Sequence, residues 1–271
     1  MRPSCLASTA RIVDLSLGEM LWARRTIFMA ALVAAPVCLA LVARFAAANG
    51  TAVLRINGAR VDSAGIFAMM LWVLYLKFIV PVLGVFYGTS LIADEVEDKT
   101  ITYLFTRPIP RRSIVMGKYV AYLLCAASMV LPSVTLVFLL LMPFAEMAAA
   151  FGPLLKDLGI LAIGLAAYGA VFLLAGVALK RPLVAGLVFA FGWEQIALVV
   201  PGYLKRFTIT YYLDGLVPQA MPAEDSLSLF QSAARDVPSA AASIFWLSVA
   251  VVTALTLAMR TVERREYVLE Q

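Results

Sequence analysis

Residues 94–118 read DEVEDKTITYLFTRPIPRRSIVMGK, and this charged stretch lies between two long apolar runs. Eight acidic and basic residues fall within residues 94–112, whereas the apolar runs end at Ala93 and resume after Lys118. A charged segment between two membrane-length apolar runs has to lie in water, because charges are costly in hydrocarbon. We therefore expect residues 94–118 to form a loop at one surface of a membrane.

Within this loop the sequence predicts one short amphipathic helix. Thr100 is a suitable N-cap, since its hydroxyl can accept hydrogen bonds from backbone N–H groups of the first turn. The helix is expected to end at Arg107, because a residue before proline is driven out of the α region, and Pro110 suits the first turn of the next helix. Such a helix can rest on lipid headgroups or fit a groove on a partner protein. Its apolar face consists of Ile101, Leu104 and Phe105.

The composition is that of an integral membrane protein. The chain has 271 residues, of which 63% are hydrophobic and 14% are charged, and its mean hydropathy is +0.92. Soluble domains usually have about 25% charged residues. The net charge of +5 is spread over the ends of apolar runs rather than gathered on one face, so nucleic acid is not an expected partner.

Six apolar runs are long enough to cross a bilayer core, which needs about 20 residues of helix. We therefore predict an all-α integral membrane fold with six transmembrane helices in a single domain. The predicted spans are residues 26–48, 66–93, 119–145, 158–179, 183–200 and 237–259.

Three segments outside these spans have patterns of their own. Residues 1–25 mix apolar residues with four arginines, which is typical of an amphipathic helix lying in the membrane interface. Residues 49–65 hold Asn57-Gly58 between alternating stretches, and this predicts a small external β-hairpin. Residues 201–236 form a longer external segment whose aromatic residues and prolines suit short helices at the outer interface.

The distribution of lysine and arginine predicts the orientation. Fourteen of the twenty-two fall on the side that holds both termini and the 94–118 loop, and seven fall on the other side. Cytoplasmic segments carry an excess of these residues. Both termini and the 94–118 loop are therefore expected in the cytoplasm.

The spacing within the loop resembles a known signature. Six of its residues follow the pattern E-x4-T-x3-L-x3-P-x2-R-x6-K, which is similar to that of the type-2 ATP-binding-cassette (ABC) exporter permeases. One departure is Lys99, because the family usually has glycine before the threonine. In that family the segment joins the second and third membrane helices and docks on the ATPase subunit through a coupling helix. The resemblance implies ATPase-coupling roles for Glu95, Thr100, Ile101, Leu104, Phe105, Pro108, Arg111 and Lys118.

The resemblance also implies a set of partners. Two cytoplasmic ABC ATPase subunits would bind ATP and Mg, and a second permease copy would complete the translocation path in the plasma (inner) membrane of a bacterium. Membrane lipid surrounds such a subunit, and a periplasmic accessory protein is a further partner that the resemblance allows. Members of the family place short re-entrant helices between spans five and six as part of an outer gate. The direction of transport, export, follows from the resemblance alone.

A homodimer with the first and fifth spans near its axis is expected from the same resemblance. Small residues in span five, which allow close helix approach, support this arrangement. The cargo stays open. Permeases of this kind serve drugs, lipids, glycans and peptides, and they also serve systems that support periplasmic metalloenzyme assembly. The small residues are Ala185, Gly186, Ala190 and Gly192.

Two other classes stay open beside the ABC permease, namely an ion-gradient-driven transporter and a non-transporting membrane scaffold. A gradient transporter should show internal repeats and paired broken helices, and no clear repeat is visible. No G-x-x-x-x-G-K-[S/T] phosphate loop occurs, so ATP hydrolysis is assigned to a partner and no enzyme activity is expected here. There is no histidine, and the three cysteines are scattered, so no cofactor or metal is predicted in this chain.

Two charged residues, Lys77 and Glu194, lie inside predicted spans. An unpaired charge at the centre of a membrane helix costs about 2.5–3.5 kcal/mol, so such residues mark sites of function. In one interpretation Lys77 extends outward to the interface while Glu194 faces a wet cavity. In the other the two side chains, at matching depths, form an ion pair or a polar lining near an outer gate. Both are expected to face the protein interior or its water-filled path rather than lipid.

Overall fold

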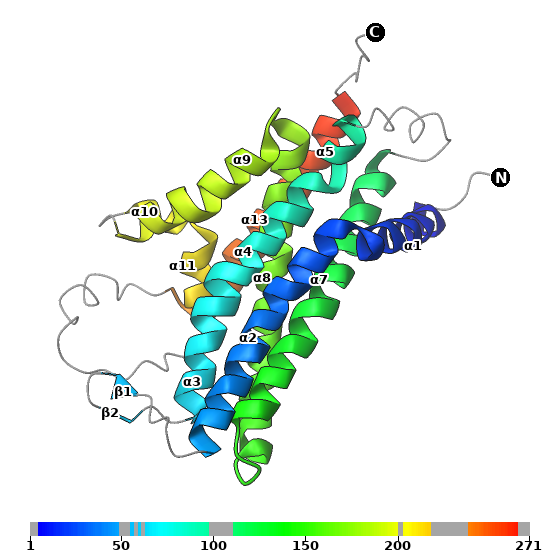
Figure 1. Cartoon of the computed structure of the whole chain (residues 1–271). Coiled ribbons are helices and arrows are strands. Elements are labelled where there is room, and N and C mark those ends of the chain that lie inside the picture. Colours follow the sequence, from blue (N-terminus) through cyan, green and yellow to red (C-terminus); the bar gives the residue numbers. More distant parts are fainter. Residues whose placement is uncertain are drawn as a thin grey trace.

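The computed structural model describes residues 5–48, 55–56, 59–60, 63–97, 111–199, 203–217 and 238–264. Figure 1 shows a bundle of long helices that run along one common direction. Helix α1, the end of α5 and the end of α13 lie at one end of this bundle, and the β1–β2 pair lies at the other.

The first half of the chain forms the N-terminal helices and the predicted second span. Trp22 ends the first helix, and the second begins at Arg24 and runs through Pro36. The second span is one continuous helical rod in which α-helical and π-helical stretches alternate. The elements are α1 (Cys5–Trp22), α2 (Arg24–Ala48), β1 (Arg55–Ile56), β2 (Ala59–Arg60), α3 (Ser63–Met70), η1 (Leu71–Ile79), α4 (Val80–Leu83), η2 (Gly84–Gly88) and α5 (Thr89–Glu97).

The second half contains the two longest helices and a series of short ones. A turn at residues 142–146 joins the two long helices, and Pro182 starts the first of the short helices. The elements are α7 (Arg111–Leu141), α8 (Met147–Ala178), α9 (Pro182–Leu187), η3 (Val188–Trp193), α10 (Glu194–Val199), η4 (Tyr203–Phe207), α11 (Ile209–Asp214) and α13 (Ala240–Arg264).

Five helices in the described part of the chain are long and apolar enough to cross a membrane. They are Arg25–Ala46, Ser63–Asp94, Arg112–Leu141, Met147–Ala178 and Ala240–Arg264. The predicted fifth span, residues 183–200, appears as a shorter apolar helix, Pro182–Ala197. At 1.5 Å per residue this helix is about 24 Å long, less than the ~30 Å of a bilayer core. Figure 1 shows α9 and α10 diverging from the bundle rather than running along it.

The N-terminal helix α1 packs against α7. Ser16 and Met20 are buried in this contact, whereas Leu15 and Trp22 are exposed on the opposite side. The helix therefore has one face on the protein and a free face on which apolar side chains are mixed with Arg11, Asp14 and Glu19. Tyr87 holds the junction between α1 and α2, because its hydroxyl donates to Thr26 Oγ1 over 2.9 Å.

The core is built around α8, which packs against α5, α7, α9 and α13. Glycines allow the closest of these approaches. A Cβ on Gly176 would lie 2.5 Å from the backbone oxygen of Thr89, and one on Gly169 would lie 2.0 Å from the ring of Tyr122. Neither position has room for a side chain, so the spacing of α8 from α5 and α7 depends on these two glycines.

The segments between the spans contain short elements. Strands β1 and β2 pair antiparallel, with Ile56 opposite Ala59. In the predicted external segment, Ile209 and Leu213 of α11 are buried, and α11 packs against α8 and α13. Part of that segment therefore belongs to the packed core instead of lying at the outer surface.

Candidate functional site

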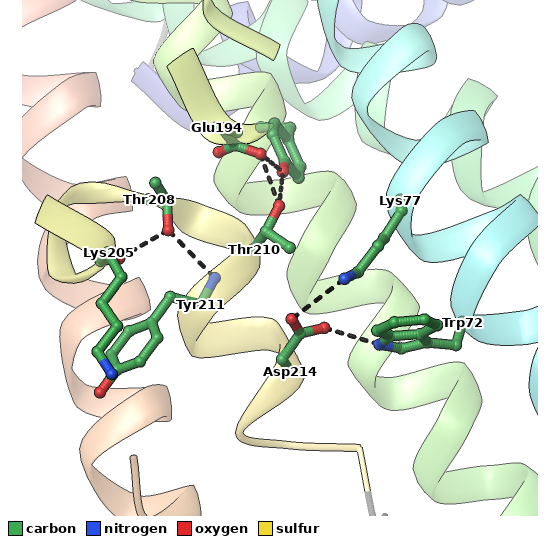
Figure 2. A network of polar contacts seen from close by, with 9 residues as sticks. Trp72, Lys77, Glu194, Lys205, Thr208, Thr210, Tyr211 and Asp214 are labelled. Carbon is green, nitrogen blue, oxygen red and sulfur yellow. Dashed lines mark hydrogen bonds and ion pairs between the residues drawn. The ribbon is translucent and has the colours of Figure 1, made fainter. Parts of the chain in front are cut away.

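The first polar group of the candidate site joins the second span to α11. The Lys77 ammonium lies 3.5 Å from Asp214 Oδ2, and the Trp72 indole N–H donates to Asp214 Oδ1 over 2.8 Å (Figure 2). The same ammonium lies 3.7 Å from the centre of a Trp72 ring, which adds a cation–π contact. The side chains of Lys77 and Asp214 are 22% and 24% exposed, so the pair is mostly removed from solvent.

The second polar group surrounds Glu194, which is 1% exposed. Its Oε2 accepts hydrogen bonds from the Tyr168 hydroxyl and from Thr210 Oγ1, the latter over 2.6 Å, and its Oε1 accepts from the backbone N–H of Ile209 over 3.1 Å. Figure 2 shows Glu194 and Thr210 pointing toward each other from α10 and α11. No described cation contacts this carboxylate, so neutral donors provide all the contacts that the structure gives it.

Helix α11 is therefore held from two sides. Glu194 of α10 binds its first residues, Ile209 and Thr210, and Lys77 of η1 binds its last, Asp214. The N-cap Thr208 also fixes its start, since the Thr208 side chain accepts from the Tyr211 N–H. Any movement of the second span relative to the α9–α10 helix must stretch one of these attachments.

Both charged residues sit in or directly after a π-helical stretch. Lys77 belongs to η1, where the Val80 N–H donates to Tyr75 O, five residues earlier. Glu194 follows η3, and its own N–H donates to Phe189 O, again five residues earlier. π-Helical turns are rare and are frequent at functional sites. A wider turn changes which side chains share a face, and it brings Trp72 and Lys77 onto the same side of the helix.

The predicted coupling loop is described only at its two ends. Helix α5 extends to Glu97 and α7 begins at Arg111, so Glu95 and Arg111 lie in helix ends, and only their backbones are described. Lys118 is buried, and its ammonium donates to Leu91 O over 2.7 Å. The remaining predicted coupling residues lie outside the described residues, and they are Thr100, Ile101, Leu104, Phe105 and Pro108.

Charged contacts fasten both helices that flank this loop to the rest of the bundle. On the α5 side, Arg25 of α2 pairs with Asp94 over 2.6 Å. On the α7 side, Arg112 donates through Nε and Nη2 to both carboxylate oxygens of Glu263 in α13, over 2.5 and 3.2 Å. Together with the Lys118–Leu91 contact between α7 and α5, these bonds connect four of the long helices at one end of the bundle.

The structure gives Lys77 and Glu194 different partners. Neither contacts the other in the described contacts, so the ion pair considered from the sequence is replaced by Lys77–Asp214. The wet cavity expected around Glu194 also differs from the structure, because this carboxylate is buried and enclosed by hydrogen-bond donors. Asp214, Trp72, Tyr168 and Thr210 were not predicted. A signal existed for Trp72 only, which lies five residues before Lys77 and would share its face in a π-helical turn.

Within the described residues, no group of three or more acidic or cysteine side chains could hold a metal ion. The candidate site thus combines carboxylates, hydroxyls, the Trp72 indole and the Lys77 ammonium. It lies where the short helices α10 and α11 contact the long apolar helices. Five membrane-length helices with charges buried between them define a multi-pass membrane protein.

The comparisons with known proteins identify the family. The sequence pattern of one protein family, described as ABC-2 family transporter protein, matches residues 16–266. The chain belongs to this family. Membership makes it a membrane permease of the ABC transporter type and implies an ABC ATPase partner in general. The resemblance of the 94–118 loop to the type-2 ABC permeases is thereby confirmed. A search of curated proteins gave no significant match.

Proposed function

We propose that this chain is the membrane-spanning subunit of an ATP-driven exporter, that it works as a homodimer, and that the 94–118 loop couples it to two cytoplasmic ATPase subunits. The observation that carries the proposal is the match to the ABC-2 family over nearly the whole chain. In this proposal Pro182–Ala197 acts as a short sixth membrane helix, and export is the direction.

The contacts around the loop support a coupling role. Both flanking helices are tied to others, α5 through Asp94–Arg25 and α7 through Arg112–Glu263. A force applied to the loop would reach α2 and α13 as well as the two helices that it joins. Closure of the ATPases on ATP would in this way tilt a group of helices together, as a shear or hinge movement does.

In the proposed movement, α11 acts as an outer gate. It bridges the second span and α10 through Asp214 and Glu194. The proposal is that tilting the second span stretches the Lys77–Asp214 contact and releases α11 from the path.

The dimer axis near the first and fifth spans is proposed from the family resemblance, and exposed apolar side chains are present on both spans to form it. Phe28 and Val42 are exposed on α2, and Trp193 and Ile196 are exposed on the shorter helix. Two of the four small residues of span five do not contribute to this axis. A Cβ on Gly186 would contact Val85 and Phe172, and Ala190 is buried, so these two residues serve packing within the subunit.

Phe105→Asp tests the coupling role. The full-length permease would be purified from its native membranes with a tag, and the co-purifying ATPase and its ATP hydrolysis would be measured. A charge on the predicted docking face should reduce the captured ATPase and its stimulation at least tenfold, since a buried unpaired charge is costly in an interface.

The matched control is Phe144→Asp, the same substitution in the turn between α7 and α8 at the opposite end of the bundle, where the side chain is 82% exposed. It should leave ATPase capture intact. Equal capture by wild type and Phe105→Asp would refute the coupling role. If no ATPase is captured by any form, wild type included, the proposed coupling to ATPase subunits fails.

A further inference from the structure

A basic pocket lies at the end of the bundle where α5 and α13 end (Figure 1). Its volume is about 280 Å³, and α2, η2, α5 and α9 contribute to it together with the turn that precedes α9. Among its lining residues, Arg25, Lys180 and Arg181 provide three positive charges against the single acid Asp94. The lining residues are Arg25, Phe86, Thr89, Ser90, Ala93, Asp94, Lys180, Arg181, Pro182, Leu183 and Val184.

The one acid among the described lining residues does not neutralise the pocket. Asp94 is engaged by Arg25 over 2.6 Å. Lys180 and Arg181 are exposed, and neither forms an ion pair with another residue that the structure describes. The hydroxyls already donate elsewhere, Thr89 to Val85 O and Ser90 to Tyr87 O. The free donors of the pocket are therefore cationic, and a guanidinium beside an ammonium suits a phosphate group.

The same pocket is apolar along one side, which distinguishes it from a site for a small soluble anion. Phe86, Leu183 and Val184 line it, and Val184 is 56% exposed. Val188, one helical turn further along, is 64% exposed. Residues four apart share a helix face, so Val184 and Val188 extend the apolar lining into a strip that leads away from the charges. A ligand that fills both parts has an anionic head and a hydrocarbon tail.

From this combination we propose that the pocket binds the phosphate headgroup of an anionic phospholipid of the cytoplasmic leaflet. Lys180 and Arg181 hold the phosphate, Arg25 closes the pocket beside it, and an acyl chain lies along Val184 and Val188. Basic pockets between membrane helices at the cytoplasmic side recognise such headgroups. The proposal depends on the orientation of the chain in the membrane, but not on ATPase coupling or dimer formation.

The test measures the thermal stability of the full-length detergent-purified protein against short-chain lipids. Dioctanoyl phosphatidylglycerol should raise the Tm in a concentration-dependent manner, whereas dioctanoyl phosphatidylcholine and inorganic phosphate should not. The double variant Lys180→Gln/Arg181→Gln should weaken the apparent affinity about 30-fold, because each base near the surface is worth about fivefold. The charge-preserving variant Lys180→Arg/Arg181→Lys should retain most of the binding.

The chain offers a matched control in Lys205-Arg206, a second lysine–arginine pair, located in η4. Lys205→Gln/Arg206→Gln removes the same charge and should bind phosphatidylglycerol as the wild type does. Equal losses in both double variants would show an unspecific charge effect and overturn the proposal. An equal rise in Tm with inorganic phosphate would also overturn the proposal, in favour of a site for free anions. An equal rise in Tm with phosphatidylcholine would overturn it in favour of unspecific lipid binding. If the first double variant does not give a folded particle, Arg181→Gln alone carries the test with an expected loss of about fivefold.

Discussion

The ammonium of Lys77 lies 3.5 Å from the carboxylate of Asp214, so a charge of the second span is paired with the last residue of α11. The second buried charge, Glu194, is stabilised separately by the Tyr168 and Thr210 hydroxyls and by the Ile209 N–H. These two polar groups share α11 and no described contact joins Lys77 to Glu194. Each polar group can therefore be changed by substitution without removing a contact of the other.

The Lys77–Asp214 pair should show strong energetic coupling. Lys77→Met leaves Asp214 without its cation, and Asp214→Asn leaves Lys77 without its anion, so each single variant should lower stability more than expected from independent sites. A double-mutant cycle on thermal stability of the purified permease should give an interaction energy of about 1–3 kcal/mol. The Trp72 hydrogen bond persists in Asp214→Asn, because the amide oxygen can accept it.

The internal control is the cycle of Lys77→Met with Glu194→Gln. Since these residues have separate partners, their effects should add within about 0.5 kcal/mol. Coupling in this second cycle, together with additivity in the first, would contradict the pairing seen in Figure 2.

Replacement of Glu194 should depend strongly on the acceptor capacity of the new side chain. Glu194→Gln keeps a carbonyl oxygen for the Ile209 N–H, whereas Glu194→Leu leaves that N–H without its acceptor. The Tyr168 and Thr210 hydroxyls also lose the carboxylate, and only one of them can donate to the other across the 2.9 Å between them. An unsatisfied buried donor costs about 1–3 kcal/mol, so the leucine variant should unfold at a much lower temperature than the glutamine variant. Glu146→Leu, at an exposed turn position, serves as the control and should change stability by no more than about 0.5 kcal/mol. Equal melting of the two Glu194 variants would mean that the hydrogen bonds to the carboxylate contribute little.

Gly176→Ala should separate α8 from α5. The new methyl group would lie 2.5 Å from Thr89 O, and a backbone atom cannot rotate away, so a loss of about 1–3 kcal/mol in stability is expected. Gly159→Ala in the same helix is the matched control, because its Cβ would have no atom within 4 Å. The control should keep or slightly raise the melting temperature, since alanine is the better helix former. A wild-type melting temperature for Gly176→Ala would show that the two helices are not in this close contact in the membrane.

Cysteine cross-linking in native membranes tests the proposed dimer axis. Single cysteines at Phe28 of α2 and Ile196 of α10, introduced into a variant in which Cys5 and the exposed Cys38 are replaced by serine, should give covalent dimers on oxidation. Leu124→Cys and Leu136→Cys on α7 are exposed to a similar degree and should stay monomeric, because α7 is not placed at the axis. Cross-links that form on α7 but not on α2 or α10 would move the interface to another face.

Much of the general architecture follows from hydropathy and charge, which are local properties of the sequence. Five of the predicted spans overlap the five long apolar helices, and the interruption at residues 94–118 falls where α5 ends and α7 begins. Helices in a bilayer have to satisfy their own backbone hydrogen bonds, so an uninterrupted apolar run of sufficient length has few other solutions. For the same reason the membership of the ABC-2 family could be predicted from a loop motif together with the pattern of spans.

Only the tertiary structure decided what the charged and small residues contact. Asp214 becomes the partner of Lys77 because α11 folds back onto the second span, and no local pattern specifies that return. Trp72 reaches the same carboxylate because a π-helical stretch places residues five apart on one face, which the α-helical period does not anticipate. Gly186 and Ala190 face the interior since α9 and η3 pack against the bundle at an angle set by their neighbours. Hydropathy determines that a segment enters the membrane. The contacts that a charged or small residue makes, and the side of the helix on which it is buried, depend on elements brought together from distant parts of the chain.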